Sequence, residues 1–254
     1  MSSILGVPVD AAYHLVSGFT SFLAPVLGGG AVVAAIVLFT VAARLILMPL
    51  SLRGLHGQAA AARLAPQLQE LRKRYAKQPE RLQREMTALY KREGTSMFAG
   101  LTPLLLQWPL LSVMYLLFRS TQIGGKANTL LTRDLFGVPL GSHWLAGAGP
   151  VSLHGLVFLG VFALLAGLCW LSVRLGRAMT VRQAGADGAN APGALVRVLP
   201  YLTVVIAAFV PLAAGIYLLT STGWALAERS FFWRTGRISG VAPTPPKPAV
   251  AARN

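Results

Sequence analysis

Residues 31–52 read AVVAAIVLFTVAARLILMPLSL, and Arg44 is the only charged residue among them. As a helix, these 22 residues would be about 33 Å long, which is enough to cross the hydrocarbon core of a bilayer. The whole chain agrees, because 54% of its residues are hydrophobic, 12% are charged and the mean hydropathy is +0.59. The sequence therefore predicts an all-α integral membrane protein with residues 31–52 as the first span.

A charged side chain at position 44 raises the free energy of inserting this span into the membrane. Arg44 lies nine residues before Arg53, so it would sit roughly 13 Å from that end of the span, where an arginine costs on the order of 2.5 to 3.5 kcal/mol. One explanation is that the side chain snorkels to the nearer headgroups, and the other is that it lines a water-filled cavity. No Asp or Glu occurs in any apolar run, so we expect no counter-ion within the spans and a charge free to meet a group from outside.

Two more apolar runs follow. Residues 97–118 form the second predicted span, which contains Gln107 and two prolines, Pro103 and Pro109. Prolines in a span leave backbone carbonyls that need other partners, so this helix is expected to bend and to border the cavity. Residues 151–173 form the third predicted span.

The last apolar run covers residues 198–227 without a charge and would be about 45 Å long as one helix, too long for an ordinary crossing. Pro211 lies near its middle, which favours two short spans, 198–210 and 212–227. Five spans with the N-terminus outside place 19 Lys and Arg residues on the cytoplasmic side and three outside. The positive-inside rule favours this topology.

Residues 53–96, between the first two spans, carry ten Lys and Arg residues and four Glu residues. Pro79 is suited to begin a helix and Gly94 to end it. Apolar residues recur there at helical spacing and predict a cytoplasmic hairpin of two helices, mobile at its glycine junctions. The apolar residues of the first helix are Leu64, Leu68, Leu71 and Tyr75, and those of the second are Leu82, Met86 and Leu89.

The two ends of the chain differ from the core. Residues 1–30 are expected to form an outer-face segment that is retained, in which residues 11–27 can lie in the membrane interface as a helix. Residues 234–254 are basic and rich in proline, which predicts a disordered cytoplasmic tail.

Several polar residues fall in the cytoplasmic halves of the predicted spans. Each Ser, Thr or Gln alone more often bonds a backbone carbonyl or a neighbouring helix. Together with the arginine, they predict a hydrophilic groove that opens toward the cytoplasm and is closed on the outer side. The predicted groove residues are Arg44, Gln107, Thr203, Tyr217, Thr220 and Ser221, with Thr222 beside them.

The sequence offers little for catalysis. It has one cysteine, Cys169, and four histidines without the spacing of metal ligands, and no nucleophile, base and acid can be grouped. We therefore expect no enzyme, no metal and no cofactor. A small-molecule or anion transporter with Arg44 as its binding site remains the alternative, although intramembrane carboxylates and inverted repeats are missing.

The order of these features resembles the YidC-type membrane protein insertases, which have relatives among the oxidase-assembly insertases of mitochondria and chloroplasts. The resemblance rests on RLILMPL (44–50), KRYAKQPERLQREMTALYKREG (73–94), GLTPLLLQWPLL (100–111), LPYLTVV (199–205) and PLAAGIYLLTS (211–221).

This resemblance implies an insertase of the bacterial plasma membrane with nascent membrane proteins as its partners. The ribosome, the Sec translocon and anionic lipids are further candidate partners, and DNA is not. By position, Arg44 matches the family's groove arginine, Gln107 matches its second-span glutamine, and Tyr217 matches an aromatic residue on the substrate path. The hairpin matches the cytoplasmic region that the family needs for activity.

Overall fold

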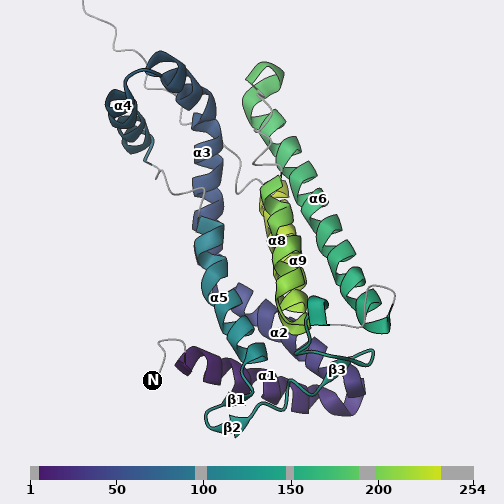
Figure 1. Cartoon of the computed structure of the whole chain (residues 1–254). Coiled ribbons are helices and arrows are strands. Elements are labelled where there is room, and N and C mark those ends of the chain that lie inside the picture. The colour runs from purple at the N-terminus through teal and green to yellow at the C-terminus, as the bar shows by residue number, and fades with distance from the viewer. Residues whose placement is uncertain (1–5, 95–101, 147–151, 189–197, 236–254) are drawn as a thin grey trace, which may run out of the picture.

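The computed structural model describes residues 6–94, 102–146, 152–188 and 198–235, and almost all of the regular structure in these ranges is helical (Figure 1). This agrees with the predicted all-α class. Within the same ranges, two stretches are long and apolar enough to cross a membrane, Gly6–Ile46 and Leu153–Ala178. The longer helices are α1 (Gly6–Leu27), α2 (Ala31–Ile46), α3 (Met48–Arg74), α4 (Pro79–Arg92), α5 (Thr102–Arg119), α6 (Leu153–Gly188) and α9 (Leu212–Arg234).

The shorter elements join these helices. Two-stranded antiparallel hairpins, β1–β2 and β3–β4, follow α5. The strands and short helices are β1 (Gln122–Ile123), β2 (Lys126–Ala127), β3 (Asp134–Leu135), β4 (Val138–Pro139), the 3₁₀ helices η1 (Gly28–Gly30), η3 (Trp144–Ala146) and η4 (Leu199–Tyr201), and α8 (Leu202–Phe209).

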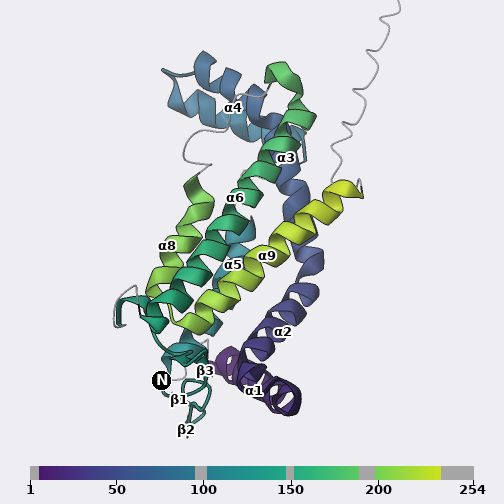
Figure 2. The same cartoon turned by 90° about the vertical axis from the view of Figure 1, so that its right-hand side faces the viewer.

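Helix α9 lies at the centre of the bundle. It packs against α2, α5, α6 and α8, and Figure 2 shows it running diagonally between α2 and α6. Its first turns, from Leu212 to Leu218, are buried, and the small residues among them let neighbouring helices approach closely. Gly215 is one of these, since a Cβ there would lie 3.6 Å from Val161 of α6. The buried core therefore forms around the first half of α9.

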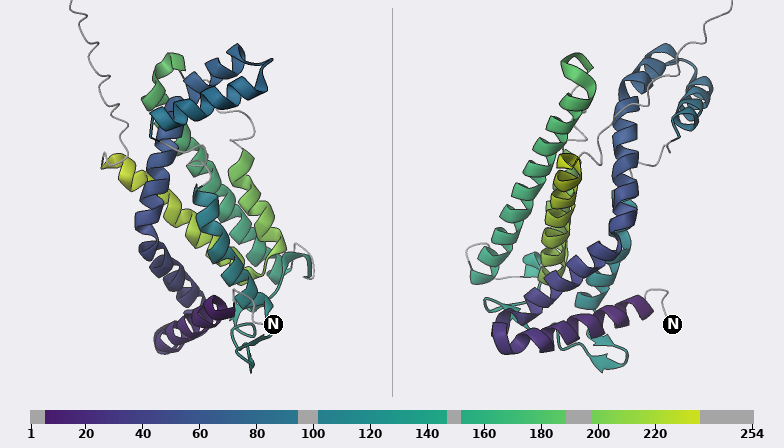
Figure 3. Two further views of the ribbon diagram at one scale, coloured as in Figure 1. Left: turned by 90° about the vertical axis from the view of Figure 1, so that its left-hand side faces the viewer. Right: turned by 180° about the vertical axis from the view of Figure 1, so that it is seen from behind.

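Helix α1 crosses the end of the bundle and meets α2 at the glycine turn η1 (Figure 3). One face of α1 is buried, through Val9, Ala12 and Val16. The opposite face exposes Val7 and Phe22, so apolar residues lie on both sides of the helix. The helix begins before the predicted interfacial segment and ends at the same residue.

The first predicted span is not a single helix. Helix α2 ends at Ile46, Leu47 forms a turn, and α3 starts at Met48 with Pro49 in its first turn. Proline has no N–H to continue the hydrogen bonds of the preceding helix, and its ring collides with the carbonyl four residues earlier. The prediction that residues 31–52 form one helix was therefore wrong. Gly54, one of the glycines at which the hairpin was expected to move relative to the first span, lies inside α3.

Helices α3 and α4 form a hairpin at the end of the molecule opposite α1 and the strands (Figure 1). Leu64, Leu68 and Tyr90 are its buried centre, and Met86 and Leu89 pack against them. Leu71, Tyr75 and Leu82 are half-buried and lie outside this cluster. Helix α4 starts at Pro79, and Gly94 follows its end with a φ of +62°, as predicted.

The later helices differ from the predictions at their ends. Helix α6 continues to Gly188, well beyond residue 173, where the third span was predicted to end. The predicted break at Pro211 is confirmed, because Val210 is extended, as residues before proline usually are. Helix α9 then continues past residue 227 to Arg234. The predicted disordered tail lies almost entirely outside the described residues.

Asn128 holds the connection between α5 and the strands through hydrogen bonds of its side-chain amide. Its Nδ2 donates hydrogen bonds to the carbonyls of Leu117, at 2.6 Å, and Ser120, at 3.0 Å. Its Oδ1 accepts a hydrogen bond from the Leu130 N–H at 3.2 Å. The buried amide therefore caps the end of α5 and fixes where the strands begin.

Candidate functional site

Arg44 lies near the end of α2, and its side chain is directed at α9. Its Nε donates a hydrogen bond to Ser221 Oγ at 3.2 Å, and its Nη2 donates to the same oxygen. Arg44 is only 7% exposed, and Ser221 is completely buried. The guanidinium thus turns into the bundle and does not extend along its own helix toward the surface.

One face of α9 carries the groups that surround this arginine. Tyr217, Ser221 and Glu228 follow each other at intervals of four and seven residues, so they lie on the same side of the helix. Tyr217 is buried next to Ser221 and Arg44. Arg44 therefore contacts a stripe of α9 in which an aromatic ring, a hydroxyl and a carboxylate succeed one another.

Glu228 changes the electrostatics of the site. It is 9% exposed, it interacts electrostatically with Arg44, and its Oε1 has no hydrogen-bond partner among the described residues. A buried carboxylate is costly unless a positive charge compensates for it, and Arg44 provides that charge. The expectation that the charge of Arg44 is free was wrong, because it interacts with the carboxylate of Glu228, which directly follows the predicted last span.

A cavity of about 130 Å³, lined by both polar and apolar side chains, opens beside Arg44, between α3, α6 and α9. Such a volume holds several water molecules. At its far wall, Arg229 Nη2 donates a hydrogen bond to Gln58 Oε1 at 2.8 Å and links α9 to α3. The polar side chains that line the cavity are Arg44, Ser51, Gln58, Ser172, Thr222, Glu228 and Arg229.

The predicted groove residues are only partly brought together. Arg44, Tyr217 and Ser221 meet, and Thr222 lines the cavity beside them. Thr220 donates its hydroxyl to the Ile216 carbonyl at 2.9 Å, so that hydroxyl is used within α9.

Two other predicted residues are not placed at the cavity. Thr203 is half-buried on α8, which packs against α6 and α9, and it is not one of the described residues that line the cavity. Gln107 is in α5, but its side chain lies outside the part of the chain that the structure describes.

Sequence reasoning missed Glu228, Arg229, Gln58, Ser51 and Ser172. The spacing of Glu228 from Ser221 and Tyr217 was a usable signal, because the three residues share a helical face. Gln58 and Ser51 carried no such signal, since their contribution depends on α3 starting at Met48 and packing next to α9.

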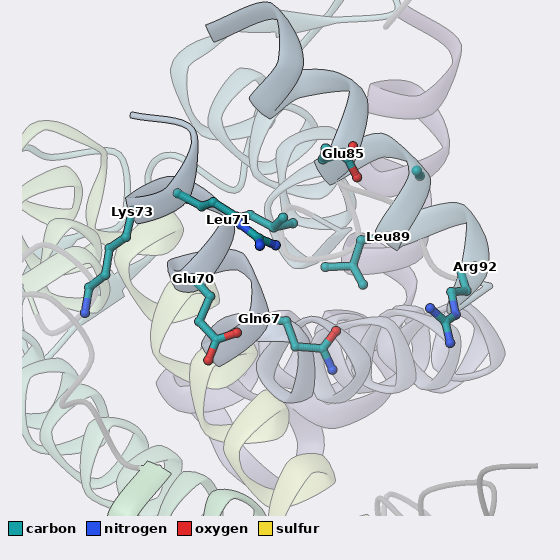
Figure 4. A pocket seen from close by; sticks show the side chains of 9 residues that line it. Gln67, Glu70, Leu71, Lys73, Glu85, Leu89 and Arg92 are labelled. Atoms are coloured by element: carbon teal, nitrogen blue, oxygen red, sulfur yellow. The ribbon is translucent and has the colours of Figure 1, made fainter. Parts of the chain in front are cut away.

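A larger hollow lies in the hairpin between α3 and α4, with Gln67 and Glu70 on one side and Glu85, Leu89 and Arg92 on the other (Figure 4). Its volume is about 850 Å³, but it is wide open to solvent. Charged side chains of both signs are spread around it, which suits contact with a large partner better than enclosure of a small ligand. Among the described residues, no three His, Cys, Asp or Glu side chains lie close enough to hold a metal ion.

Comparison with known proteins places the chain in a family. The family described as "60Kd inner membrane protein" matches residues 22–237. A membrane protein insertase YidC of Clostridium tetani is 34% identical over 114 residues, which are 45% of this chain and 52% of the relative. The protein of the same name from Clostridium perfringens is 34% identical over 106 residues, 42% of this chain and 44% of the relative.

A third relative with this name, from Ruegeria sp., is 31% identical over 159 residues, which are 58% of this chain and 26% of that protein. The chain thus spans about half the length of the Clostridium tetani relative and less of the other two. The family match covers the helices that hold Arg44, the hairpin and all of α9. The chain therefore belongs to the 60Kd inner membrane protein family.

Proposed function

We propose that this protein is a non-enzymatic membrane protein insertase of the bacterial plasma membrane. It receives segments of nascent membrane proteins in the cavity beside Arg44 and helps them to enter the bilayer. The observation that carries the proposal is a buried arginine beside a cavity that seven polar or charged side chains help to line, between apolar helices. The names of the three relatives support the same activity.

The proposed topology keeps the five predicted spans, at about residues 31–52, 97–118, 151–173, 198–210 and 212–227. They include α2, α5, much of α6, α8 and most of α9. The α3–α4 hairpin and the C-terminus are cytoplasmic, and the N-terminus, α1 and the strands are outside. The positive-inside rule supports this arrangement, because the hairpin is rich in Lys and Arg and the strand region has few. The basic hairpin is then the surface available to the ribosome, the Sec translocon or anionic lipids.

The topology predicts a labelling pattern. In a Cys169→Ala background, a cysteine at the exposed Lys126, beside the β1–β2 turn, should react with an impermeant maleimide in intact cells. A cysteine at the exposed Lys73 of α3 should react only after the cells are opened. If the cysteine at Lys73 reacted in intact cells and the one at Lys126 only after opening, the proposed orientation would have to be inverted.

The cavity would lower the cost of moving a polar segment into the membrane. Two opposite charges 4 Å apart attract by about 4 kcal/mol at an effective dielectric constant of 20 and by about 1 kcal/mol in water. An acidic group of a substrate must compete with Ser221 and Glu228 for Arg44, so the attraction is moderate and reversible. Release follows because the apolar helix of the substrate is more stable in lipid than in a polar cavity.

Glu228 gives a prediction about substrate preference. Glu228→Gln removes the carboxylate that competes for Arg44, so insertion of an acidic segment relative to a neutral one should rise about threefold to tenfold, which corresponds to roughly 0.7 to 1.4 kcal/mol. Glu80→Gln, which neutralises an exposed glutamate on α4, is the matched control and should leave the ratio unchanged. Equal ratios for both variants would remove Glu228 from substrate selection.

Reconstitution tests the function itself. The purified chain in liposomes should insert a single-span protein with a short translocated tail, measured by protection of the tail from protease. An anion transporter would instead show a saturable flux of a small anion across the same liposomes. Flux without insertion would replace the proposed function with the alternative.

A further inference from the structure

The two strand hairpins contain tight turns with the same backbone conformation. In the β1–β2 turn, Gly124 and Gly125 have φ values of +55° and +76°. In the β3–β4 turn, Phe136 and Gly137 have φ values of +52° and +78°. Glycine, Asn and Asp are the usual residues in such turns, because other side chains are strained at positive φ. The chain thus has glycine at the first turn position of one hairpin and phenylalanine at the same position of the other.

Phe136 gains little from the rest of the chain in return for this strain. It is the only non-glycine residue with positive φ in the described ranges. Its side chain is 76% exposed, so packing within the protein does not compensate for the backbone conformation. A strained residue persists where its surroundings determine it. The β3–β4 pairing and the hydrogen bond that the Gly137 N–H donates to Asp134 Oδ2, at 3.0 Å, set this turn, and neither involves the ring of Phe136. The exposed ring is therefore available for a contact outside the chain.

The surroundings of this turn are apolar. A Cβ at Gly137 would lie 3.9 Å from the Leu153 side chain, and Leu153 is itself 61% exposed. Strand β3 contacts η1, and the residues that precede η1, Val26 and Leu27, are also exposed. Figure 3 shows the α1–α2 turn at this end of the molecule.

The position of Leu153 indicates where the β3–β4 turn lies relative to the membrane. Leu153 is the first residue of α6, and it begins the apolar stretch Leu153–Ala178 that is long enough to cross a membrane. The turn at Phe136 is therefore at the height where this helix would enter the bilayer. The β1–β2 turn has different neighbours, because a Cβ at Gly124 would lie 3.0 Å from the Asp10 carboxylate.

We propose that Phe136 anchors the β3–β4 turn in the outer leaflet, with its ring among the phospholipids at the boundary of headgroups and acyl chains. Aromatic residues at this depth hold a membrane protein at a fixed height. The contact would fix the β3–β4 turn against the start of α6 and the α1–α2 turn. This inference rests on the proposed function only through its topology, in which α6 crosses the membrane with Leu153 at the outer face.

Spin labelling of the purified chain in liposomes tests whether Phe136 is such an anchor. Nitroxides are attached to single cysteines at Phe136, Lys126 and Leu164 in the Cys169→Ala background, and collisions with oxygen and with a water-soluble nickel complex are compared. The label at Phe136 should favour oxygen severalfold more than the label at Lys126. Leu164, an exposed residue in the middle of α6, reports separately whether that helix is in the bilayer.

The outcomes separate the two proposals. If Leu164 is in lipid and Phe136 is as accessible to nickel as Lys126, the anchor is refuted and the topology stands. The same result would follow if Phe136 met a protein partner, since none is present in these liposomes. Phe136→Trp keeps an aromatic ring, and brominated lipids should quench its added fluorescence more than that of Lys126→Trp; equal quenching also refutes the anchor.

Discussion

Replacing Arg44 by glutamate should reduce insertion of acidic segments at least about tenfold, which corresponds to roughly 1.4 kcal/mol. The substitution puts a second carboxylate into a cavity that already contains Glu228, and both would repel an acidic substrate. A substrate whose Asp and Glu residues are changed to Lys should recover, because attraction returns with opposite signs. Insertion of a matched acidic, neutral and basic series into liposomes measures the effect.

Two other replacements separate charge from hydrogen bonding. Arg44→Lys should keep most of the activity, since a substrate that makes no fixed bidentate contact needs only a cation. Arg44→Ala should reduce the insertion of acidic segments more than the insertion of neutral ones. Ser221→Ala is the matched control, because it removes the hydrogen bonds from Arg44 Nε and Nη2 and keeps the charge. Equal loss on all three substrates for every variant would mean that Arg44 serves only the structure.

Replacing Leu64 by aspartate should unfold the hairpin and abolish most insertion. Leu64 is 3% exposed and packs with Leu68 and Tyr90 in a cluster that holds α3 and α4 together. Truncation of a buried leucine to alanine alone costs about 2 to 5 kcal/mol, and a buried carboxylate costs more. Hydrogen exchange should show rapid exchange throughout α4 in this variant and protection in the parent.

Gln83→Asp is the control for this experiment, because Gln83 is exposed on α4 outside the hollow between α3 and α4, and the new charge remains in water. It should leave both the protection of α4 and the insertion activity close to those of the parent. Full insertion by a Leu64→Asp variant whose α4 amides exchange rapidly would show that the folded hairpin is dispensable.

Strong periodic patterns predicted much of this fold. Apolar residues at helical spacing predicted the helical hairpin. Of the residues expected to interrupt helices, Pro79 begins α4, Gly94 follows its last turn and Pro211 separates α8 from α9. The cost of a charge in an apolar run also singled out Arg44 as a candidate groove residue. Its contact with Ser221 joins residues 177 positions apart, which depends on how α2 and α9 pack.

Other features of the structure were not predicted, each for its own reason. The break at Leu47 is hidden in a continuous apolar run, and hydrophobicity does not distinguish one helix from two. Glu228 was overlooked because it follows the last apolar residue of the run, although α9 continues beyond it. The strand hairpins consist of two-residue strands, too short for an alternating pattern, and their anchor Asn128 acts through backbone carbonyls.

Site-specific photocrosslinking tests the central claim most directly. A photoreactive residue at Thr222, which lines the cavity, is compared with one at the exposed Leu164 of α6 while a ribosome holds a stalled membrane protein with an acidic translocated tail. The tail should crosslink to position 222, and Arg44→Glu should abolish that crosslink. A tail that crosslinks at position 164 but not at position 222 would contradict passage through the cavity beside Arg44.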